Sequence, residues 1–488
     1  MKLERKNMFR TIKFNQCNFI SKTVYLLMII FMFLSELHAQ NLSSSLANAY
    51  SNHPLLFSER AGERIVSESV AEALSGWKPE VYVDGSLGKS LVITKTNSAT
   101  KTSSNLPISM GIVVEKKIYD GGKTSQNVKI ADTKFTISQS KLMIIENKVL
   151  LKAAIAYFNL LKEKDLLTIA KKNKEVIKRQ LEATKDRFDV GDLTVTDVSQ
   201  AEARLSDADA NLVKAESDLD TAKAIFFSNI GLEPEDIFYP EVMPILPQNL
   251  QALIGDVKAF NPSFIFANKN RILAQEELNL ALKEMSLSVN LTASANQAWD
   301  PNTFFEEQRY FDISANLKYP LYLGGKDKSN IRKYREKLIK SNSDIDNTLR
   351  EETEKAMIIW NKIQSLNSQI VAFNASIRAN EIALEGVVQE ENVGARTVID
   401  VLDAENELFM AKANFIKANT DLFIASYELL GVTGRMNARD LNLPVVSFYD
   451  SNEYYNRMKS LSGGMNTDSN SLLDLLNTKS KSLLDLLN

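Results

Sequence analysis

The chain of 488 residues is poor in the side chains that most enzymes use for catalysis. It contains one cysteine, Cys17, and two histidines. Zinc sites, cysteine nucleophiles and histidine-based triads depend on these residue types, so we expect no enzymatic activity, no metal site and no cofactor. Lys and Arg number 58 against 61 Asp and Glu. Because a nucleic-acid-binding chain carries a basic face, we expect no nucleic-acid partner.

The first 39 residues have the pattern of a secretory signal peptide. Six Lys and Arg and two acids surround the apolar run 24–34, and Ala39 precedes Gln40. A basic start, a short apolar run and a small residue at the cleavage point define such a signal. The run is short for a membrane span. We therefore expect residues 1–39, with Cys17, to be removed on export.

A stretch of the chain occurs twice, 203 residues apart. Residues 190–231 and 393–434 are identical at 18 of 42 positions without a gap. The same offset relates Tyr119 to Tyr322. The chain is therefore a tandem duplication of one large unit. We assign residues 40–240 to the first repeat and 241–445 to the second. Residues 446–488 are a low-complexity tail that we expect to be disordered.

Two very long helices are predicted, one in each repeat. Residues 123–189 and 326–392 contain no proline, and a continuous helix of that length would reach roughly 100 Å. Such a rod needs partner helices. The next segment of each repeat has apolar residues at alternating spacings of three and four, with alanine at one heptad position. This pattern predicts coiled-coil packing with closely spaced helix axes.

Four segments are predicted to be strands, two in each repeat. Apolar residues alternate with polar ones around Val81 and Val83, at 108–114, at 287–295 and at 311–319. With aromatic residues near the strand ends, such as Trp299 and Tyr310, the alternation fits a membrane β-barrel. A soluble sheet with one wet face shows the same alternation. Four strands cannot close a barrel, and an open edge is costly in lipid, so several chains would have to combine.

Turn residues separate these elements. Polar residues 93–105 and 297–309 are expected to form hairpin loops. The Gly-Gly pairs at 121–122 and 324–325 return the chain from strand to long helix, since glycine adopts the required backbone angles. At the far end of each rod the pairs Val190-Gly191 and Val393-Gly394 turn the chain.

The chain resembles the TolC family of outer-membrane efflux proteins over about residues 41–443. The most specific segment is 393–405, Val-Gly-Ala-Arg-Thr-Val-Ile-Asp-Val-Leu-Asp-Ala-Glu, supported by Asn52-His53-Pro54, Asn261-Pro262 and 320–325. The resemblance implies a mainly α chain with membrane β: tandem-duplicated long helical hairpins plus four strands. It also implies a homotrimer in outer-membrane lipid, whose 12-stranded β-barrel continues as an α-helical barrel across the periplasm.

The resemblance further implies a closable constriction at the helical tips. Asp400 and Asp403 fall on the family's pore-facing acidic rings, and Arg396 falls on an arginine that helps hold the tip shut. Thr196 and Asp197 correspond to its partners in the first repeat. The Val-Gly tips, Val190, Gly191, Val393 and Gly394, would dock a periplasmic adaptor and an inner-membrane pump.

Four tip positions can also be interpreted from the residues themselves. Asp197 and Asp400 each follow a threonine by three residues, so both can instead cap a helix. Asp403 has no capping explanation, because its counterpart in the first repeat is Gln200. Glu391 stands where the best-known family member has a tyrosine, and we expect it to pair with Arg396 instead.

These observations predict a passive outer-membrane exit channel of a tripartite efflux system. An exit duct for type I protein secretion is an alternative with the same architecture. A structural trimeric coiled-coil spacer or adhesin is an alternative of another class, although a spacer has no use for lipid-facing strands.

Overall fold

The computed structural model describes residues 41–461, except 241 and 303. The predicted signal peptide and the tail beyond residue 461 lie outside this part. In chain order the elements are α2 (Leu42–Asn52), α3 (Pro54–Ser75), β1 (Glu80–Leu87), β2 (Ser90–Lys95), β3 (Thr100–Asn105), β4 (Ile108–Tyr119), α4 (Lys123–Asp189), α5 (Val195–Ile230), α6 (Leu250–Phe260), α7 (Pro262–Leu282), β5 (Ser288–Asn302), β6 (Phe305–Lys318), α8 (Lys326–Asn392), α9 (Val398–Val432) and α10 (Ser451–Leu461).

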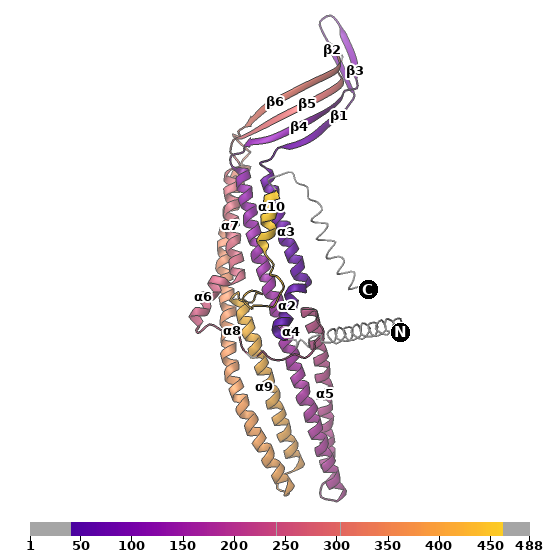
Figure 1. Ribbon diagram of the computed structural model, residues 1–488, viewed down its shortest axis with the longest axis vertical. Coiled ribbons are helices and arrows are strands. Elements are labelled where there is room, and N and C mark those ends of the chain that lie inside the picture. Colours follow the sequence, from indigo (N-terminus) through magenta and orange to yellow (C-terminus); the bar gives the residue numbers. More distant parts are fainter. Residues whose placement is uncertain (1–40, 241, 303, 462–488) are drawn as a thin grey trace, which may run out of the picture.

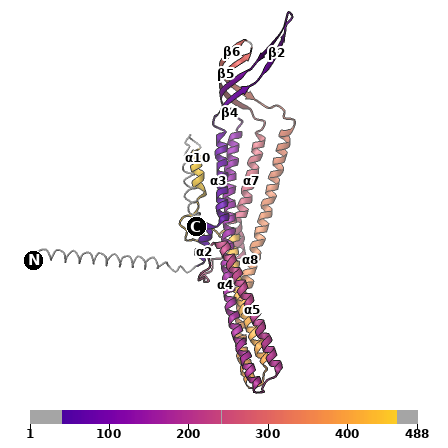
Figure 2. The ribbon, with the colours of Figure 1, turned by 90° about the vertical axis from the view of Figure 1, so that its right-hand side faces the viewer.

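The molecule is a long helical rod with a sheet at one end and two helical tips at the other (Figure 1). Helices α4 and α8 run the length of the rod. Near the sheet α3 and α7 accompany them, and towards the tips α5 and α9 do so (Figures 1 and 2). None of the helices in the described part combines the length and apolar character needed to cross a membrane.

The two long helices have the predicted bounds and the predicted length of 67 residues. Each begins after a glycine in the left-handed region, Gly122 at φ 77° and Gly325 at φ 84°, where a side chain would be strained. The predicted role of the Gly-Gly pairs is therefore confirmed.

Each long helix folds back on its successor, α4 on α5 and α8 on α9, and the two hairpins pack together through α4 and α9. Ala201, Ala208 and Ala222 on α5 are buried, as the alanine positions of the heptad pattern predict. The largest apolar cluster lies halfway along the rod, where Tyr157 and Phe158 of α4 meet Phe226 of α5 and Phe423 of α9.

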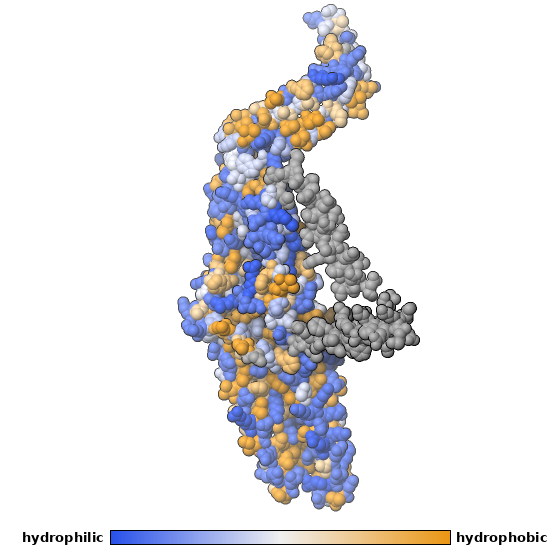
Figure 3. Space-filling view, viewed as in Figure 1, coloured by the Kyte–Doolittle hydropathy of each residue, from blue (hydrophilic) through white to orange (hydrophobic). Residues whose placement is uncertain are grey.

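The sheet has the strand order β1-β4-β5-β6, entirely antiparallel. Its register places Val83, Ile112, Ala295 and Phe311 in one row across the four strands. Directly opposed residues point to the same face, so apolar side chains collect on one side of the sheet. Phe311 is 85% exposed on this face. Figure 3 shows apolar residues gathered over the sheet. The predicted alternation is confirmed.

The predicted loops are wrong over most of their length. Residues 90–95 and 100–105 form the β2–β3 hairpin, whose turn closes with Thr96 N–H donating to Ala99 O at 2.8 Å. Strands β5 and β6 continue through most of 297–309. Polar residues extend a sheet as well as apolar ones do when their backbone groups find cross-strand partners, and composition does not reveal that pairing.

The predicted disorder of residues 446–488 is wrong for residues 451–461, which form α10. Its Tyr455 ring stacks on Phe135 of α4 with centroids 4.4 Å apart, and the Tyr455 hydroxyl donates to Asp132 at 2.7 Å. Met458 is buried in the same cluster. Aromatic side chains that pack against a partner elsewhere in the fold can stabilise a segment whose polar composition predicts disorder.

Candidate functional site

The two helical tips form the candidate functional site. They lie at the end of the rod opposite the sheet, where α4 turns into α5 and α8 turns into α9 (Figure 1). Gly191 at φ 86° and Gly394 at φ 77° make these turns. The neighbouring valines are exposed, Val190 by 77% and Val393 by 79%. The predicted turns are confirmed, and each presents an apolar side chain to solvent.

Both tips carry the same cap. The Thr194 N–H and hydroxyl donate to the Asp197 carboxylate at 2.9 and 2.7 Å, and the Asp197 N–H donates back to the threonine hydroxyl at 3.3 Å. Thr397 and Asp400 repeat these distances. The capping interpretation is thus confirmed for both aspartates. It leaves the second oxygen of each carboxylate available for other contacts.

These caps set the protonation of the two aspartates. The pKa of Asp197 and that of Asp400 lie below the ordinary value, chiefly because the backbone N–H of the capping threonine donates to the carboxylate. For Asp400 the nearby Arg396 guanidinium adds to the effect. Both side chains are therefore anionic well into the acidic range.

Two ion pairs link the hairpins of the two repeats. Arg204 of α5 donates to the Asp403 carboxylate of α9. Arg187 of α4 donates to the Glu391 carboxylate of α8, whose side chain is only 8% exposed. Both arginines come from the first repeat and both acids from the second. Each pair therefore joins one tip to the other.

The predicted pairing of Glu391 with Arg396 is wrong. Arg396 instead donates to Glu390 at 2.9 Å and lies 3.9 Å from Asp400. Glu391 turns away from the tip surface and into the contact between α8 and α4. Adjacent residues on a helix point about 100° apart, so Glu390 and Glu391 cannot serve the same partner.

Thr196 lies exposed on the first turn of α5. Among the described contacts, Arg396 is bonded to neither Thr196 nor Asp197. One chain therefore brings together Arg396, Glu390 and Asp400 on one tip, while the two first-repeat positions stand apart on the other.

Sequence reasoning named Glu390 among the carboxylates near Arg396 but missed Arg187 and Arg204. The duplication held a signal for them, because the counterparts of Arg187 and Arg204 in the second repeat are Glu390 and Glu407. Where equivalent positions of the two repeats carry opposite charges, their neighbouring residues differ as well. The described residues contain no group of three or more His, Cys, Asp and Glu placed to hold a metal.

The chain matches the protein family described as "Outer membrane efflux protein" twice, over residues 46–230 and 253–435. These two matches coincide with the two repeats. The chain is 31% identical over 432 residues to the outer membrane efflux protein BepC of Brucella suis, covering 88% of this chain and 92% of BepC. It is 26% identical over 416 residues to the outer membrane protein TolC of Vibrio cholerae, covering 83% and 93% of the two chains.

The fold has a counterpart among solved structures. The Campylobacter jejuni CmeC outer membrane channel superimposes with a TM-score of 0.73 at 14% identity, covering 86% of this chain and 89% of CmeC. At that identity the likeness concerns the fold, while the family match concerns the whole rod with its sheet and tips. The chain therefore belongs to the outer membrane efflux protein family, as an exit channel of the outer membrane that extends into the periplasm.

Proposed function

We propose that three copies of this chain close into one continuous duct, which receives small solutes at the helical tips from a periplasmic adaptor and an inner-membrane pump. The duct performs no chemical conversion. One observation carries the proposal. Within the chain α4 of the first repeat packs on α9 of the second, and the equivalent packing of α8 on α5 needs a second copy.

Within the chain, Leu181 of α4 shares a buried cluster with Val398 and Leu402 of α9. The repeat offset of 203 residues makes Leu384 of α8 the equivalent of Leu181, and Val195 of α5 the equivalent of Val398. Val398 is 2% exposed, whereas Val195 is 64% exposed. The α8 helix of a second copy, laid on α5 as α4 lies on α9, would cover Val195.

The sheet supports the same closure. Its outer strands β1 and β6 each pair with a single described strand, and an unpaired edge in lipid leaves backbone groups without partners. Pairing β6 of one copy with β1 of the next removes every edge. Three copies give 12 strands, the number that the family resemblance implies.

Cross-linking tests the assembly directly. Val195→Cys with Leu384→Cys, treated with a short bismaleimide, should yield linked dimers and trimers on denaturing gels, because the two thiols meet across copies. Leu181→Cys with Val398→Cys is the matched control and should keep the mass of one chain. Linked species in the control alone would contradict closure by this contact. Cys17 lies in the predicted signal peptide and adds no thiol to the exported chain.

At the tips we propose that Asp400, Asp403, Arg396, Asp197, Thr196 and Glu391 surround the constriction. The pair of the buried Glu391 with Arg187 holds the hairpins of one chain together, while Arg396 and the capped aspartates face the axis. A constriction lined by carboxylates favours cations.

Docking is proposed at Val190, Gly191, Val393 and Gly394. Each valine offers an exposed apolar side chain, and a Cβ added to either glycine would meet no atom within 4 Å. A helical hairpin of an adaptor can therefore approach the backbone closely.

Deleting the gene separates the candidate functions. Efflux predicts that cells accumulate more ethidium, and that the plasmid-borne chain reverses this. Loss of particular proteins from the medium with unchanged ethidium accumulation would favour type I secretion. A purified trimer that conducts no current in planar bilayers would favour the structural spacer.

A further inference from the structure

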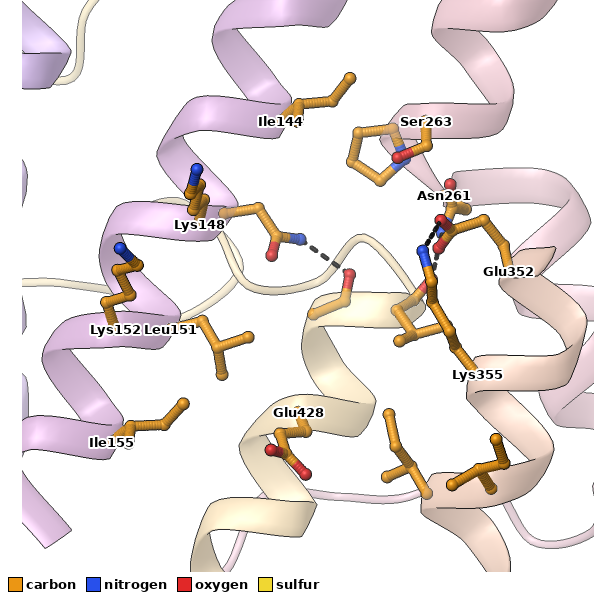
Figure 4. Close-up of a pocket in the computed structure, with 16 residues that line it drawn as sticks. Ile144, Lys148, Leu151, Lys152, Ile155, Asn261, Ser263, Glu352, Lys355 and Glu428 are labelled. Carbon is orange, nitrogen blue, oxygen red and sulfur yellow. Dashed lines mark hydrogen bonds and ion pairs between the residues drawn. The ribbon is translucent and has the colours of Figure 1, made fainter. Parts of the chain in front are cut away.

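A cavity of about 520 Å³ lies halfway along the rod, between α4 and α8. It forms where α9 ends at Val432 and α7 begins at Pro262, so that no continuous helix fills the space between the two long helices. Asn261 bridges this break by donating to Val432 O and to Glu352, both at 2.8 Å. Figure 4 shows α4 residues Lys148 and Ile155 on one side of the cavity and α8 residues on the other.

The α4 side of the cavity faces away from helix α10. Gln139 of α4 bonds α10 through Asn452, and Lys148 follows nine residues later. At about 100° per residue the two side chains point about 180° apart.

This direction places the cavity on the side of α4 opposite α10, which we take as the inner side of the proposed duct. The cavity therefore opens towards the solutes that the channel conducts.

The floor of the cavity is apolar. Its aliphatic lining comes from α4, α8 and the break between α9 and α7: Ile144, Leu151, Ile155, Pro262, Ile358, Ile359 and Val432. An apolar body that settles on this floor releases water from both surfaces.

The rim of the cavity carries excess positive charge. Lys148 and Lys152 are exposed, and neither has an acidic partner within 4 Å in the described part of the chain. The two acids of the lining are already engaged: Glu352 accepts from Lys355 at 2.7 Å, and Glu428 accepts from Lys362 at 3.2 Å. Two ammonium groups one helical turn apart are thus left beside the apolar floor.

We propose that this cavity binds anionic amphiphiles, molecules with one carboxylate or sulfonate and a hydrocarbon or aromatic body. The body lies on the aliphatic floor and the anionic group accepts hydrogen bonds from Lys148 and Lys152. The binding chemistry depends only on the cavity. Its role, as a resting place for cargo inside the duct, depends on the proposed function.

Photolabelling tests the site. The probe is decanoate with a diazirine near the end of its chain, used below its micelle concentration on the intact oligomer held in amphipol. Labels should appear on peptides that contain Ile155 or Ile358. A hydrogen bond to a charged group is worth about one tenfold step in affinity, so Lys148→Ala with Lys152→Ala should lower labelling at least tenfold.

Two controls keep the test specific. Lys129→Ala with Lys134→Ala removes two exposed lysines of the same helix outside the cavity and should leave labelling unchanged. The diazirine analogue of decanol lacks the charge and should label less, and equally in all variants. Equal labelling of the wild type by acid and alcohol, or unchanged labelling in the Lys148/Lys152 variant, would overturn the proposal.

Conductance measurements distinguish ligand binding at the cavity from conduction by the oligomer. Decanoate should reduce the current of the wild-type oligomer in planar bilayers and should not do so in the Lys148/Lys152 variant. Specific labelling in an oligomer that conducts no current would refute the duct while supporting the site. Current that decanoate leaves unchanged, together with absent labelling, would refute the site while supporting the duct.

Discussion

The pair of the partly exposed Arg187 with the buried Glu391 gives the sharpest prediction about the tips. A hydrogen bond to a charged group contributes about 1.5–3 kcal/mol, and a neutral one about 0.5–1.5 kcal/mol. Glu391→Gln keeps the shape and one hydrogen bond from the still charged Arg187 guanidinium but removes the carboxylate charge, so each chain loses at most about 1–1.5 kcal/mol. If opening parts the hairpins in all three chains, the losses sum to at most about 3–4.5 kcal/mol. The ratio of open to closed channels then rises by up to about 10²–10³.

Single-channel recording in planar bilayers measures this ratio as the open probability. Glu390→Gln is the matched control on the same helix turn, because Glu390 and its partner Arg396 are both about half exposed. Pairs of that kind contribute about 0–1 kcal/mol, so the control should change the ratio by less than about tenfold. High salt should also raise the open probability of the wild type, but only by the amount that screening weakens its exposed ion pairs.

A double variant distinguishes the ion pair from a general disturbance. Arg187→Met with Glu391→Gln removes both charges, so no buried charge is left without a partner. The two single effects should therefore add to more than the double effect, since the partners share one interaction. An open probability for Glu391→Gln equal to the wild type, or below that of Glu390→Gln, would refute the reasoning.

Three further predictions concern the tips. Gly394→Trp places a bulky side chain at φ 77° on the proposed docking surface and should abolish transport while the oligomer keeps its mass; normal transport would place docking elsewhere. Asp403→Ala should weaken cation selectivity and block by multivalent cations, and block unchanged in this variant would make Asp403 a solvated helix residue. Asp400 has a lowered pKa, so its cap stabilises the helix above the ordinary value of 3.8 and is lost as pH falls through the lower folded value. Thr397→Val removes one donor and should move that loss to higher pH, measurable as helix melting by circular dichroism; an unmoved transition would assign the lowered pKa to other contacts.

Much of the architecture was predictable because local rules govern it. The duplication fixed the pairing of repeats, and the absence of proline fixed the two long helices. The caps at Thr194 and Thr397 were predictable from a spacing of three residues, because their hydrogen bonds join residues within one turn. The apolar face of the sheet followed from alternation with a period of two.

The misses share one cause, which is a pairing or packing partner that the composition of the segment itself does not reveal. The strands at 90–105 depended on cross-strand backbone pairing, which polar composition does not reveal. Helix α10 depended on Phe135 and Asp132, more than 300 residues earlier. Burial against such a partner can order a segment whose own residues favour neither helix nor strand.

The sequence by itself determined the repeat, which direct comparison of its two halves shows. It also determined the rods, the turns and the caps, since each of these depends on residues within a few positions of one another. Only the tertiary structure decided which arginine serves which acid at the tips. Arg187 and Glu391 are 204 residues apart, and their meeting depends on the rotation of α4 and α8 about their axes. One residue of rotation, about 100°, separates Glu391, buried against Arg187, from Glu390, exposed beside Arg396.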